Sequence, residues 1–500
     1  MIEIIDRVTD PAIRARAVAR YRERGIALPT FAQMRDPRLV PPAVVKRLAG
    51  LGLWDLDPLN LYRITWKNDP RERGGLYGGV NYLELPPALT GVPARIVMLV
   101  GKWFPTGAHK VGAAYGCLAP KIISGGFDPT YHKAVWPSTG NYCRGGAFDS
   151  YLMGCTAVAI LPAEMSSERF AWLREIGAEV IATPGCESNV KEIYDKCWEL
   201  RRTREDVVIF NQFSEFGNAA WHYHCTGTAL AEVFAQLRGP GAAGGHDGGP
   251  RLAAYVATTG SAGTIAAGDY LRAVAPRVKV VAAEALQCPT LLWNGFGGHR
   301  IEGIGDKHVP WIHNVRNTDA VAAIDDADCL RLLRLFNDPA GREVLAAERV
   351  PAAVLDDLPL LGISSLANLL AAIKTARWFE LGGDDVILTI ATDSVDLYGS
   401  RLIELAEAHG PYTARQAARD LERSLLGQRS DHFKELTWPE RKAIHNLKYY
   451  TWVEQQQMDV DDLNALWSEP GLWERIFAQP ARWDTMIEEF NAETGVLAGL

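Results

Sequence analysis

The sequence has no long basic tract and no apolar run long enough to cross a membrane as a helix. Its formal net charge is −8, which argues against a nucleic acid or an anionic membrane as the main partner. The segment from Met1 to Arg7 lacks the basic start and apolar core of a secretory signal. We therefore expect a cytoplasmic protein that needs neither nucleic acid nor membrane for its function.

The cysteines show no metal-binding pattern. None of the eight pairs with another at the spacing of a zinc finger, so we expect most of them to be reduced and buried. Cys143, beside Arg144, is interpreted as a small apolar filler at a helix start rather than an activated thiol. His222, His224 and Cys225 lie close together, but no fourth ligand follows at a suitable spacing. No metal site is predicted.

What the chain does have is a regular alternation of strand and helix patterns. With 500 residues and 48% hydrophobic content, it is long enough for two or three domains with substantial cores. Strands are predicted at 133–136, 155–161, 179–182 and 207–210, separated by helices at 145–153, 167–176 and 189–202. Such a run of βα units requires a parallel sheet. Residues 238–250 are expected to form a flexible surface loop, and a second run follows from 252 to about 402.

One lysine is notable for its position. Lys110 closes the segment that begins at Pro105, directly after the apolar stretch from Ile96 to Val100 that is typical of a strand. A lysine on a short glycine-containing turn can form a Schiff base with a carbonyl where its surroundings disfavour the ammonium form. Because lysines follow small residues in many loops, this position indicates catalysis only together with further evidence downstream.

Two downstream loops supply that evidence. The segment from Thr258 to Thr264 lies between a predicted strand at 252–257 and a predicted helix at 265–274. Its backbone N–H groups can converge on a phosphate at the positive end of the helix, although an ordinary glycine-rich turn would have a similar sequence. The segment from Pro137 to Tyr142 contains hydroxyls, an amide and free N–H groups that can together bind a carboxylate.

These features recur in the order of a known family. From about residue 96 to 402 the chain resembles the pyridoxal-phosphate enzymes of the tryptophan synthase β type, or fold type II, and within it the cysteine synthase and cystathionine β-synthase branch. Eight short motifs in the family's order make coincidence a poor explanation. They are Pro105 to Lys110, Ser138 to Asn141, Met165 to Arg169, Asn211 to Phe213, His222-Tyr223 with Thr226-Gly227, Gly260 to Thr264, Glu302 to Gly305, and Gly362 to Ser365.

The resemblance implies a role for each segment. Lys110 would carry pyridoxal 5′-phosphate as a Schiff base and move the proton at Cα of the substrate. The other residues expected to bind the cofactor are His109 near the phosphate, Asn141 at the phenolic oxygen, Gly260, Ser261, Ala262, Gly263 and Thr264 around the phosphate, and Gly303 near the cofactor face. The residues expected to clamp the substrate carboxylate are Ser138, Thr139, Gly140 and Gln212.

Two departures from the family pattern bear on mechanism. The family usually places Ser or Thr against the pyridine nitrogen, but Asp393 aligns there, between Thr392 and Ser394. A carboxylate would favour a protonated nitrogen and a stronger electron sink. Alternatively, Asp393 caps a turn and a neighbouring hydroxyl, from Ser394 or Thr392, faces the ring. In addition, Val111-Gly112 follow the lysine where cysteine synthases usually have an Asp-Arg pair, a pattern closer to the tryptophan synthase β subunit.

The resemblance also implies the fold, an α/β protein with two parallel-sheet βα domains. Residues 96–132 and 225–402 would form the large cofactor-binding domain, and residues 133–224 a smaller mobile domain that closes on the substrate. Two parts fall outside the resemblance, and of these residues 1–95 are expected to be an N-terminal extension packed on the core. Residues 403–500 would be a helical, tryptophan-rich C-terminal extension that needs a partner surface, either the parent domain or a second subunit. We expect a homodimer.

The implied reaction is β-elimination from a small amino acid through an aminoacrylate intermediate, which gives a 2-oxo acid. The alternative is β-replacement of the cysteine synthase or cystathionine β-synthase type. A racemase, or a non-catalytic cofactor-binding protein that acts through a partner, are further alternatives. The missing Asp-Arg pair and the acid at position 393 favour elimination.

Overall fold

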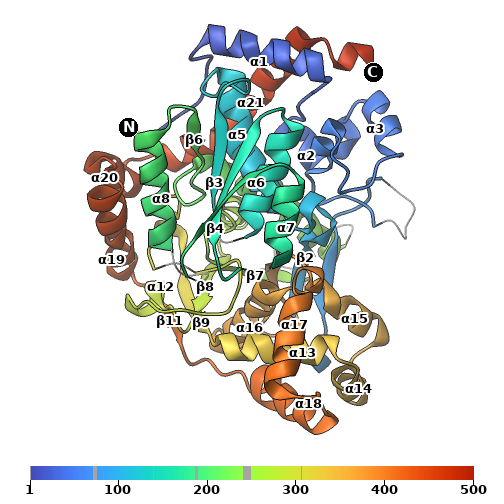
Figure 1. Ribbon diagram of the computed structural model, residues 1–500. Helices are drawn as coiled ribbons and strands as arrows, with labels where there is room; N and C mark the ends of the chain where they lie inside the picture. The colour runs from blue at the N-terminus through green and yellow to red at the C-terminus, as the bar shows by residue number, and fades with distance from the viewer. Residues whose placement is uncertain are drawn as a thin grey trace.

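The computed structural model describes residues 2–70, 76–138, 140–165, 167–185, 190–239, 249–305 and 307–500, with the backbone alone at 167–169. The described chain forms two sheets with helices packed around them (Figure 1). The predicted α/β fold with two βα sheets is confirmed. Predictions that concern Thr139, Ser166, Cys186 and Asn189, and most of the loop at 238–250, lie outside the described residues.

The smaller sheet has four parallel strands in the order β5-β4-β3-β6. They are β3 (Lys133–Pro137), β4 (Thr156–Pro162), β5 (Glu179–Thr183) and β6 (Val207–Ile209), connected by α6 (Asn141–Leu152), α7 (Ser167–Glu175) and α8 (Val190–Thr203). Inner strand β3 carries apolar residues on both faces, which suits a strand covered on both sides. Its carboxyl end leads directly into Ser138 and the start of α6.

The larger sheet has seven strands in the order β1-β2-β10-β7-β8-β9-β11. The five central strands are parallel: β2 (Arg95–Val100), β10 (Asp385–Ala391), β7 (Arg251–Thr258), β8 (Lys279–Ala285) and β9 (Ala320–Ile324). At the two edges, β1 (Tyr82–Leu85) pairs with β2 and β11 (Phe433–Glu435) pairs with β9, both antiparallel. The sequence analysis did not predict these edge strands, since each is too short to show a clear alternating pattern.

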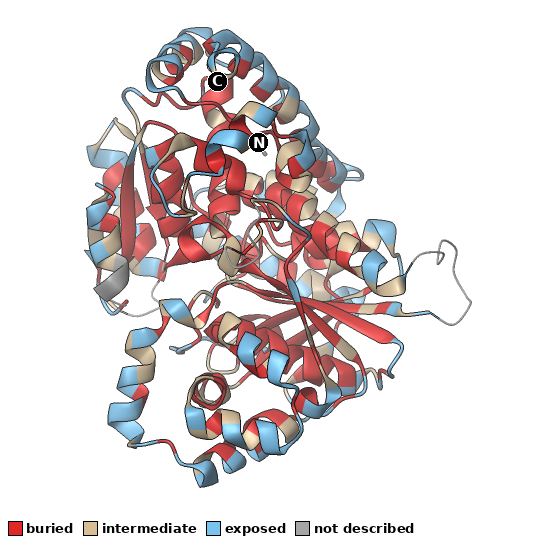
Figure 2. Cartoon of the chain, turned by 90° about the vertical axis from the view of Figure 1, so that its right-hand side faces the viewer, coloured by how far each residue is buried: buried red, intermediate tan, exposed pale blue. Residues whose placement is uncertain are grey.

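Two helices are buried along most of their length, α5 (Lys110–Ser124) and α16 (Ile363–Trp378). A helix that is apolar on all sides belongs inside a protein. Around them lie α9 (Phe216–Trp221), α10 (Gly227–Arg238), α11 (Ala266–Val274), α12 (Thr290–Trp293), α13 (Asp326–Asn337), α14 (Pro339–Ala347) and α15 (Ala352–Asp357). Figure 2 shows buried residues concentrated in the sheets and inner helices, with exposed residues on the outer helices. Among the described helices, none has the length and apolar character required to cross a membrane.

The N-terminal and C-terminal segments pack against each other at the top of Figure 1, where α1 and α21 lie side by side. The N-terminal helices are α1 (Pro11–Arg24), α2 (Phe31–Arg35), α3 (Pro42–Leu48) and α4 (Pro87–Thr90), and the C-terminal ones are α17 (Gly399–His409), α18 (Ala414–Asp420), α19 (Trp438–Lys448), α20 (Val460–Ser468) and α21 (Leu472–Thr494). Asn491 exchanges two hydrogen bonds with the backbone of Leu28, at 2.8 and 2.9 Å. The division of the chain into four units stays a prediction.

An ion pair between a buried lysine and a partly exposed aspartate ties the C-terminal segment to α16. Lys374 on α16 donates to Asp431 Oδ1 at 2.6 Å and to the carbonyl oxygens of Asp431 and Arg429 at 2.8 and 3.2 Å. The Lys374 side chain is only 5% exposed, whereas that of Asp431 is 56% exposed. The hydrogen bond from Lys374 lowers the pKa of Asp431 below its ordinary value of 3.8. The pair fixes the chain just before β11.

We expect Asp431→Asn to lower the stability at neutral pH by about 1 kcal/mol, because Lys374 keeps two carbonyl partners and Asp431 is partly screened by solvent. A depressed folded-state pKa gives stability that is present above the unfolded value of 3.8 and lost as the pH falls through the folded value. The difference between the two proteins should therefore shrink below pH 3.8, measured as the urea midpoint. Asp356→Asn, which breaks an exposed pair with Arg342, is the matched control. Equal effects in both variants would contradict the prediction.

Candidate active site

Lys110 is the first residue of α5, at the end of an irregular connection from β2. Within that connection Thr106 and Gly107 adopt φ values of 66° and 70°, so the chain turns sharply before the helix begins. The amine Nζ of Lys110 donates to Ser261 Oγ at 3.1 Å and to Gln212 Oε1 at 3.4 Å. Three segments that are far apart in the sequence thus meet at one amine.

The glycine-rich loop connects β7 to α11. A Cβ on Gly260 would lie 3.0 Å from the carbonyl oxygen of Gly303, and a Cβ on Gly263 would overlap the amide of Asn218. Ala262 adopts a φ of 61°. The loop therefore lies in close contact with two other segments, and its backbone precedes a nine-residue helix whose positive end can attract an anion.

Asn218 on α9 is a site residue that the sequence analysis missed. It is fully buried, and its Nδ2 donates to Ser261 Oγ at 3.0 Å and to the carbonyl oxygen of Gln212 at 2.9 Å. The side chain thereby connects the glycine-rich loop to the segment that carries Gln212. No sequence motif points to it, because its role depends on contacts with residues far along the chain.

The predicted carboxylate loop lies at the carboxyl end of β3. Ser138 Oγ accepts hydrogen bonds from the backbone N–H of Gly140 and from Gln212 Nε2, both at 3.2 Å. Ser138, Gly140 and Gln212 are thus brought together, while Thr139 lies outside the described residues. Asn141 follows as the first residue of α6.

Two histidines beside the lysine are neutral. His109 Nε2 lies 3.2 Å from Thr392 Oγ1, and the His109 ring centroid is 4.9 Å from that of His222. Burial, reinforced by the charge of Lys110, holds the pKa of His109 far below its ordinary value of 6.5. Burial, together with the neighbouring His109, also holds the pKa of His222 far below 6.5. Neither ring adds a positive charge at neutral pH.

Asp393 is fully buried next to Asn141. Its Oδ2 accepts hydrogen bonds from Asn141 Nδ2 at 2.6 Å and from the Tyr398 hydroxyl at 2.8 Å. Two small cavities lie next to Lys110. Thr392, in the turn after β10, lines both of them, whereas Asp393 and Ser394 in the same turn line neither. Among these three residues, Thr392 is therefore the one at the wall of the cavities.

Two small adjoining cavities, of about 10 and 30 Å³, meet at Lys110. Both are lined by Lys110, Gly260, Ser261, Gly303, Ile304 and Thr392. The first is also lined by His109, Ala262 and Thr264, all expected cofactor residues. The second is also lined by Ser138, Gly140 and Gln212, all expected substrate residues, together with Asn141. Gly263 lines neither cavity and instead packs against Asn218.

The other candidate residues have structural partners. His222 Nδ1 lies 2.9 Å from Thr226 Oγ1, and His224 Nε2 lies 2.5 Å from the carbonyl oxygen of Phe477. Across the described residues, no group of three or more His, Cys, Asp or Glu side chains is arranged to hold a metal ion. Cys143 is fully buried at the start of α6.

Comparison with known proteins identifies the class. The family model described as "Pyridoxal-phosphate dependent enzyme" matches residues 103–393, more than half of the chain, so the chain belongs to this family. The predicted family and its coenzyme, pyridoxal phosphate, are thereby confirmed.

Individual relatives fall in the same branch. The chain is 28% identical to a probable cysteine synthase of Bacillus subtilis, over 61% of this chain and 88% of the relative. It is 26% identical to cystathionine beta-synthase of Saccharomyces cerevisiae, over 64% of this chain and 60% of the relative. Among solved structures, an O-acetylserine dependent cystathionine beta-synthase from Helicobacter pylori matches with a TM-score of 0.53 at 22% identity, over 64% of this chain and 94% of that one. This last similarity shows the shared fold.

We expect Asn218→Ala to lower the free energy of unfolding by about 1–3 kcal/mol, because it removes the donor to the Gln212 carbonyl oxygen and one of the donors to Ser261 Oγ. The measurement is the urea midpoint of purified protein. Asn464→Ala on the exposed face of α20 is the matched control and should have little effect. A midpoint for Asn218→Ala equal to that of the control would show that the bridge contributes nothing.

Proposed function

We propose that the protein is a pyridoxal-phosphate-dependent enzyme that eliminates a leaving group from Cβ of a small amino acid. The observation that carries this proposal is the position of Lys110 Nζ between two adjoining cavities. One cavity is lined by the glycine-rich loop and the other by Ser138 and Gln212. A coenzyme aldehyde, its phosphate and a substrate carboxylate need partners of these three kinds within reach of one amine.

The residues present fit the coenzyme. The loop from Gly260 to Thr264 offers backbone N–H groups before a helix, as a phosphate dianion requires. Asn141 Oδ1 and His109 Nδ1 are buried without a hydrogen-bond partner in the described structure, so a bound group can satisfy them. The two cavities have volumes of only about 10 and 30 Å³, so binding of the coenzyme would require the segments that line them to separate. This supports the proposal that residues 133–224 move.

When bound, the coenzyme supplies an electron sink for the bonding electrons of the substrate Cα–H bond. In this proposal Lys110 Nζ holds the coenzyme aldehyde and then removes the proton from Cα as a general base. Ser138 and Gln212 orient the substrate carboxylate through hydroxyl and amide groups. Closure of the site excludes water from the reacting carbon.

The contacts of Thr392 and Asp393 favour one of the two alternatives for the residue that faces the ring nitrogen. Thr392 lines the cavities and lies beside His109, whereas Asp393 holds Asn141 and Tyr398. We propose that Thr392 faces the ring and that Asp393 acts by orienting Asn141. Direct contact between Asp393 and the nitrogen stays a prediction of the sequence analysis.

Elimination is favoured over replacement by the segment after the lysine. A Cβ on Gly112 would overlap the indole ring of Trp221, so the second residue of the usual Asp-Arg pair has no room at this position. β-Replacement remains the second candidate, because the curated relatives include cysteine synthases and cystathionine beta-synthase.

As part of the same proposal the protein is a cytoplasmic homodimer. Light scattering of the purified protein tests the dimeric state.

We expect Lys110→Ala to abolish turnover and to lose the covalently attached coenzyme. Borohydride reduction followed by peptide mass spectrometry should find the attached coenzyme on Lys110 in the parent protein. The matched control is Lys102→Ala, which removes a nearby lysine that pairs with Asp396. Attachment at another lysine, or normal turnover of Lys110→Ala, would overturn the proposal.

The reaction type is tested by incubating the loaded enzyme with single amino acids and assaying ammonia, sulfide and 2-oxo acid. We expect ammonia and oxo acid from serine or cysteine without a second nucleophile. Product only when O-acetylserine and a thiol are both present would assign β-replacement. Release of D-amino acid without oxo acid would assign racemisation. Failure of any amino acid to change the coenzyme absorption would remove the enzymatic interpretation.

A further inference from the structure

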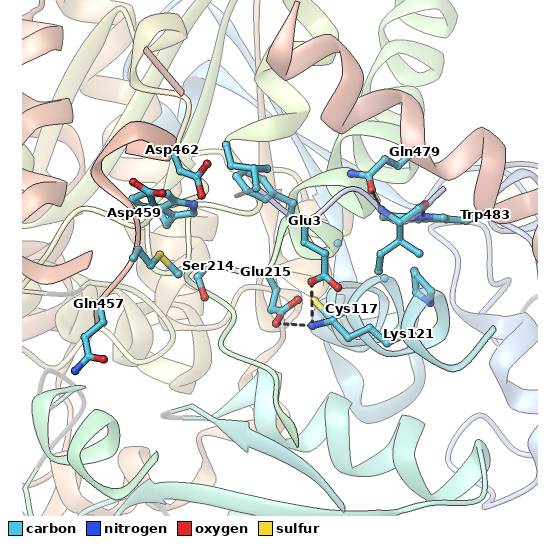
Figure 3. Close-up of a pocket in the computed structure, with 18 of the residues that line it drawn as sticks. Glu3, Cys117, Lys121, Ser214, Glu215, Gln457, Asp459, Asp462, Gln479 and Trp483 are labelled. Carbon is cyan, nitrogen blue, oxygen red and sulfur yellow. Dashed lines mark hydrogen bonds and ion pairs between the residues drawn. The ribbon is translucent and has the colours of Figure 1, made fainter. Parts of the chain in front are cut away.

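A larger cavity lies at the far end of α5 from Lys110 (Figure 3). Its volume is about 420 Å³, within the range of small-molecule sites. The walls come from the N-terminal segment, the C-terminal part of α5, the residues from Ser214 to Gly217, the residues from Gln457 to Asp462, and α21. None of these residues belongs to the two cavities at Lys110.

The wall formed by the N-terminal segment is held in place. The backbone N–H of Ile5 donates to Gln479 Oε1 at 2.7 Å, and the indole of Trp483 donates to the carbonyl oxygen of Ile5 at 2.8 Å. Both partners lie on α21 and line the cavity (Figure 3). The cavity therefore lies where segments outside the region matched by the family model pack against α5 and the residues from Ser214 to Gly217, which lie inside that region.

Charged groups gather on one side of this cavity. Lys121 pairs with Glu215 at 3.2 Å and with Glu3 at 3.4 Å, as the dashed lines in Figure 3 show. Burial alone would lower the pKa of Lys121, but Glu215 and Glu3 outweigh it and raise the pKa. Burial raises the pKa of Glu215 against the attraction of Lys121. Two carboxylates share this one lysine, so one negative charge is left in excess beside it.

The balance of charge selects a cation. Four carboxylates line the cavity, from Glu3, Glu215, Asp459 and Asp462, against the two cations Lys121 and Arg201. The formal excess is two negative charges in a concave site, where low-dielectric walls strengthen the field. A positive group close to Glu215 would also favour its ionised form.

The remaining lining is largely apolar. Phe216, Trp311 and Trp483 contribute aromatic surface, and Ile5 and Met458 contribute aliphatic surface. Aromatic faces bind both apolar groups and organic cations. A ligand that satisfies both sides of this cavity has a cationic head and an apolar body.

We propose that this cavity is a second ligand site for a small molecule that carries a primary ammonium group on an apolar body. The carboxylates of Glu215 and Glu3 receive the ammonium group, and the aromatic wall receives the body. Free amines and amino acids share this chemistry. The site adjoins the active site through one short segment, because Glu215 lies three residues after Gln212.

The test is calorimetric titration of the coenzyme-loaded protein with 2-phenylethylamine and L-phenylalanine as ammonium probes. 2-Phenylethanol and phenylacetate are the matched neutral and anionic probes. We expect an ammonium probe to bind at least about tenfold more tightly than either control, as the loss of a charge-assisted hydrogen bond implies. Binding of phenylethylamine alone would indicate free amines, and binding of phenylalanine as tightly or more tightly would indicate amino acids.

Variants locate the binding. Glu3→Gln and Glu215→Gln should each weaken binding by about tenfold. The side chain of Glu3 is 63% exposed, so its replacement should not disturb folding. Glu199→Gln, which removes an exposed carboxylate paired with Lys196, is the matched control and should bind as the parent does. Unchanged coenzyme absorption during the titration would separate this site from Lys110. Absence of binding by both ammonium probes, equal binding of phenylacetate, or unchanged affinity in the folded glutamine variants would overturn the proposal.

Discussion

The position of Lys110 depends on the close packing of α5 against α9. A Cβ on Gly116 would lie 2.5 Å from the carbonyl oxygen of Gly217, and a Cβ on Gly112 would overlap the ring of Trp221. These contacts hold α5 and α9 close together, because packed interiors tolerate little change in volume. They therefore fix the direction in which the Lys110 side chain leaves the first turn of the helix, toward Ser261 and Gln212.

The same packing links the two ends of α5 to different chemistry. At its N-terminus the amine is surrounded by hydroxyl and amide groups and by histidines that burial keeps neutral. At its C-terminal part Lys121 is held between two carboxylates at the edge of a much larger cavity. A helix apolar on all sides can carry a lysine at each end because each lysine has polar partners where it leaves the apolar interior.

The segments outside the family match are part of the same structure. β1 and β11 complete the two edges of the larger sheet, and covered edges are protected from pairing with other chains. The tryptophans of the C-terminal segment that are buried find backbone acceptors, as Trp452 does at Val309 and Trp483 at Ile5. Sequence patterns could not predict these contacts, since a three-residue strand and an isolated indole become stable only through a distant partner.

The sequence by itself determined the order of strands and helices in the βα runs, the lysine and the two anion-type loops, because periodicity and short motifs are local properties of the chain. The tertiary structure decided which residues share a cavity. It brought Asn218 between two loops, placed Thr392 rather than Asp393 at the cavity wall, and joined the N-terminal and C-terminal segments around a second cavity. These arrangements depend on long-range packing, which fixes side-chain direction only after the sheets and helices have come together.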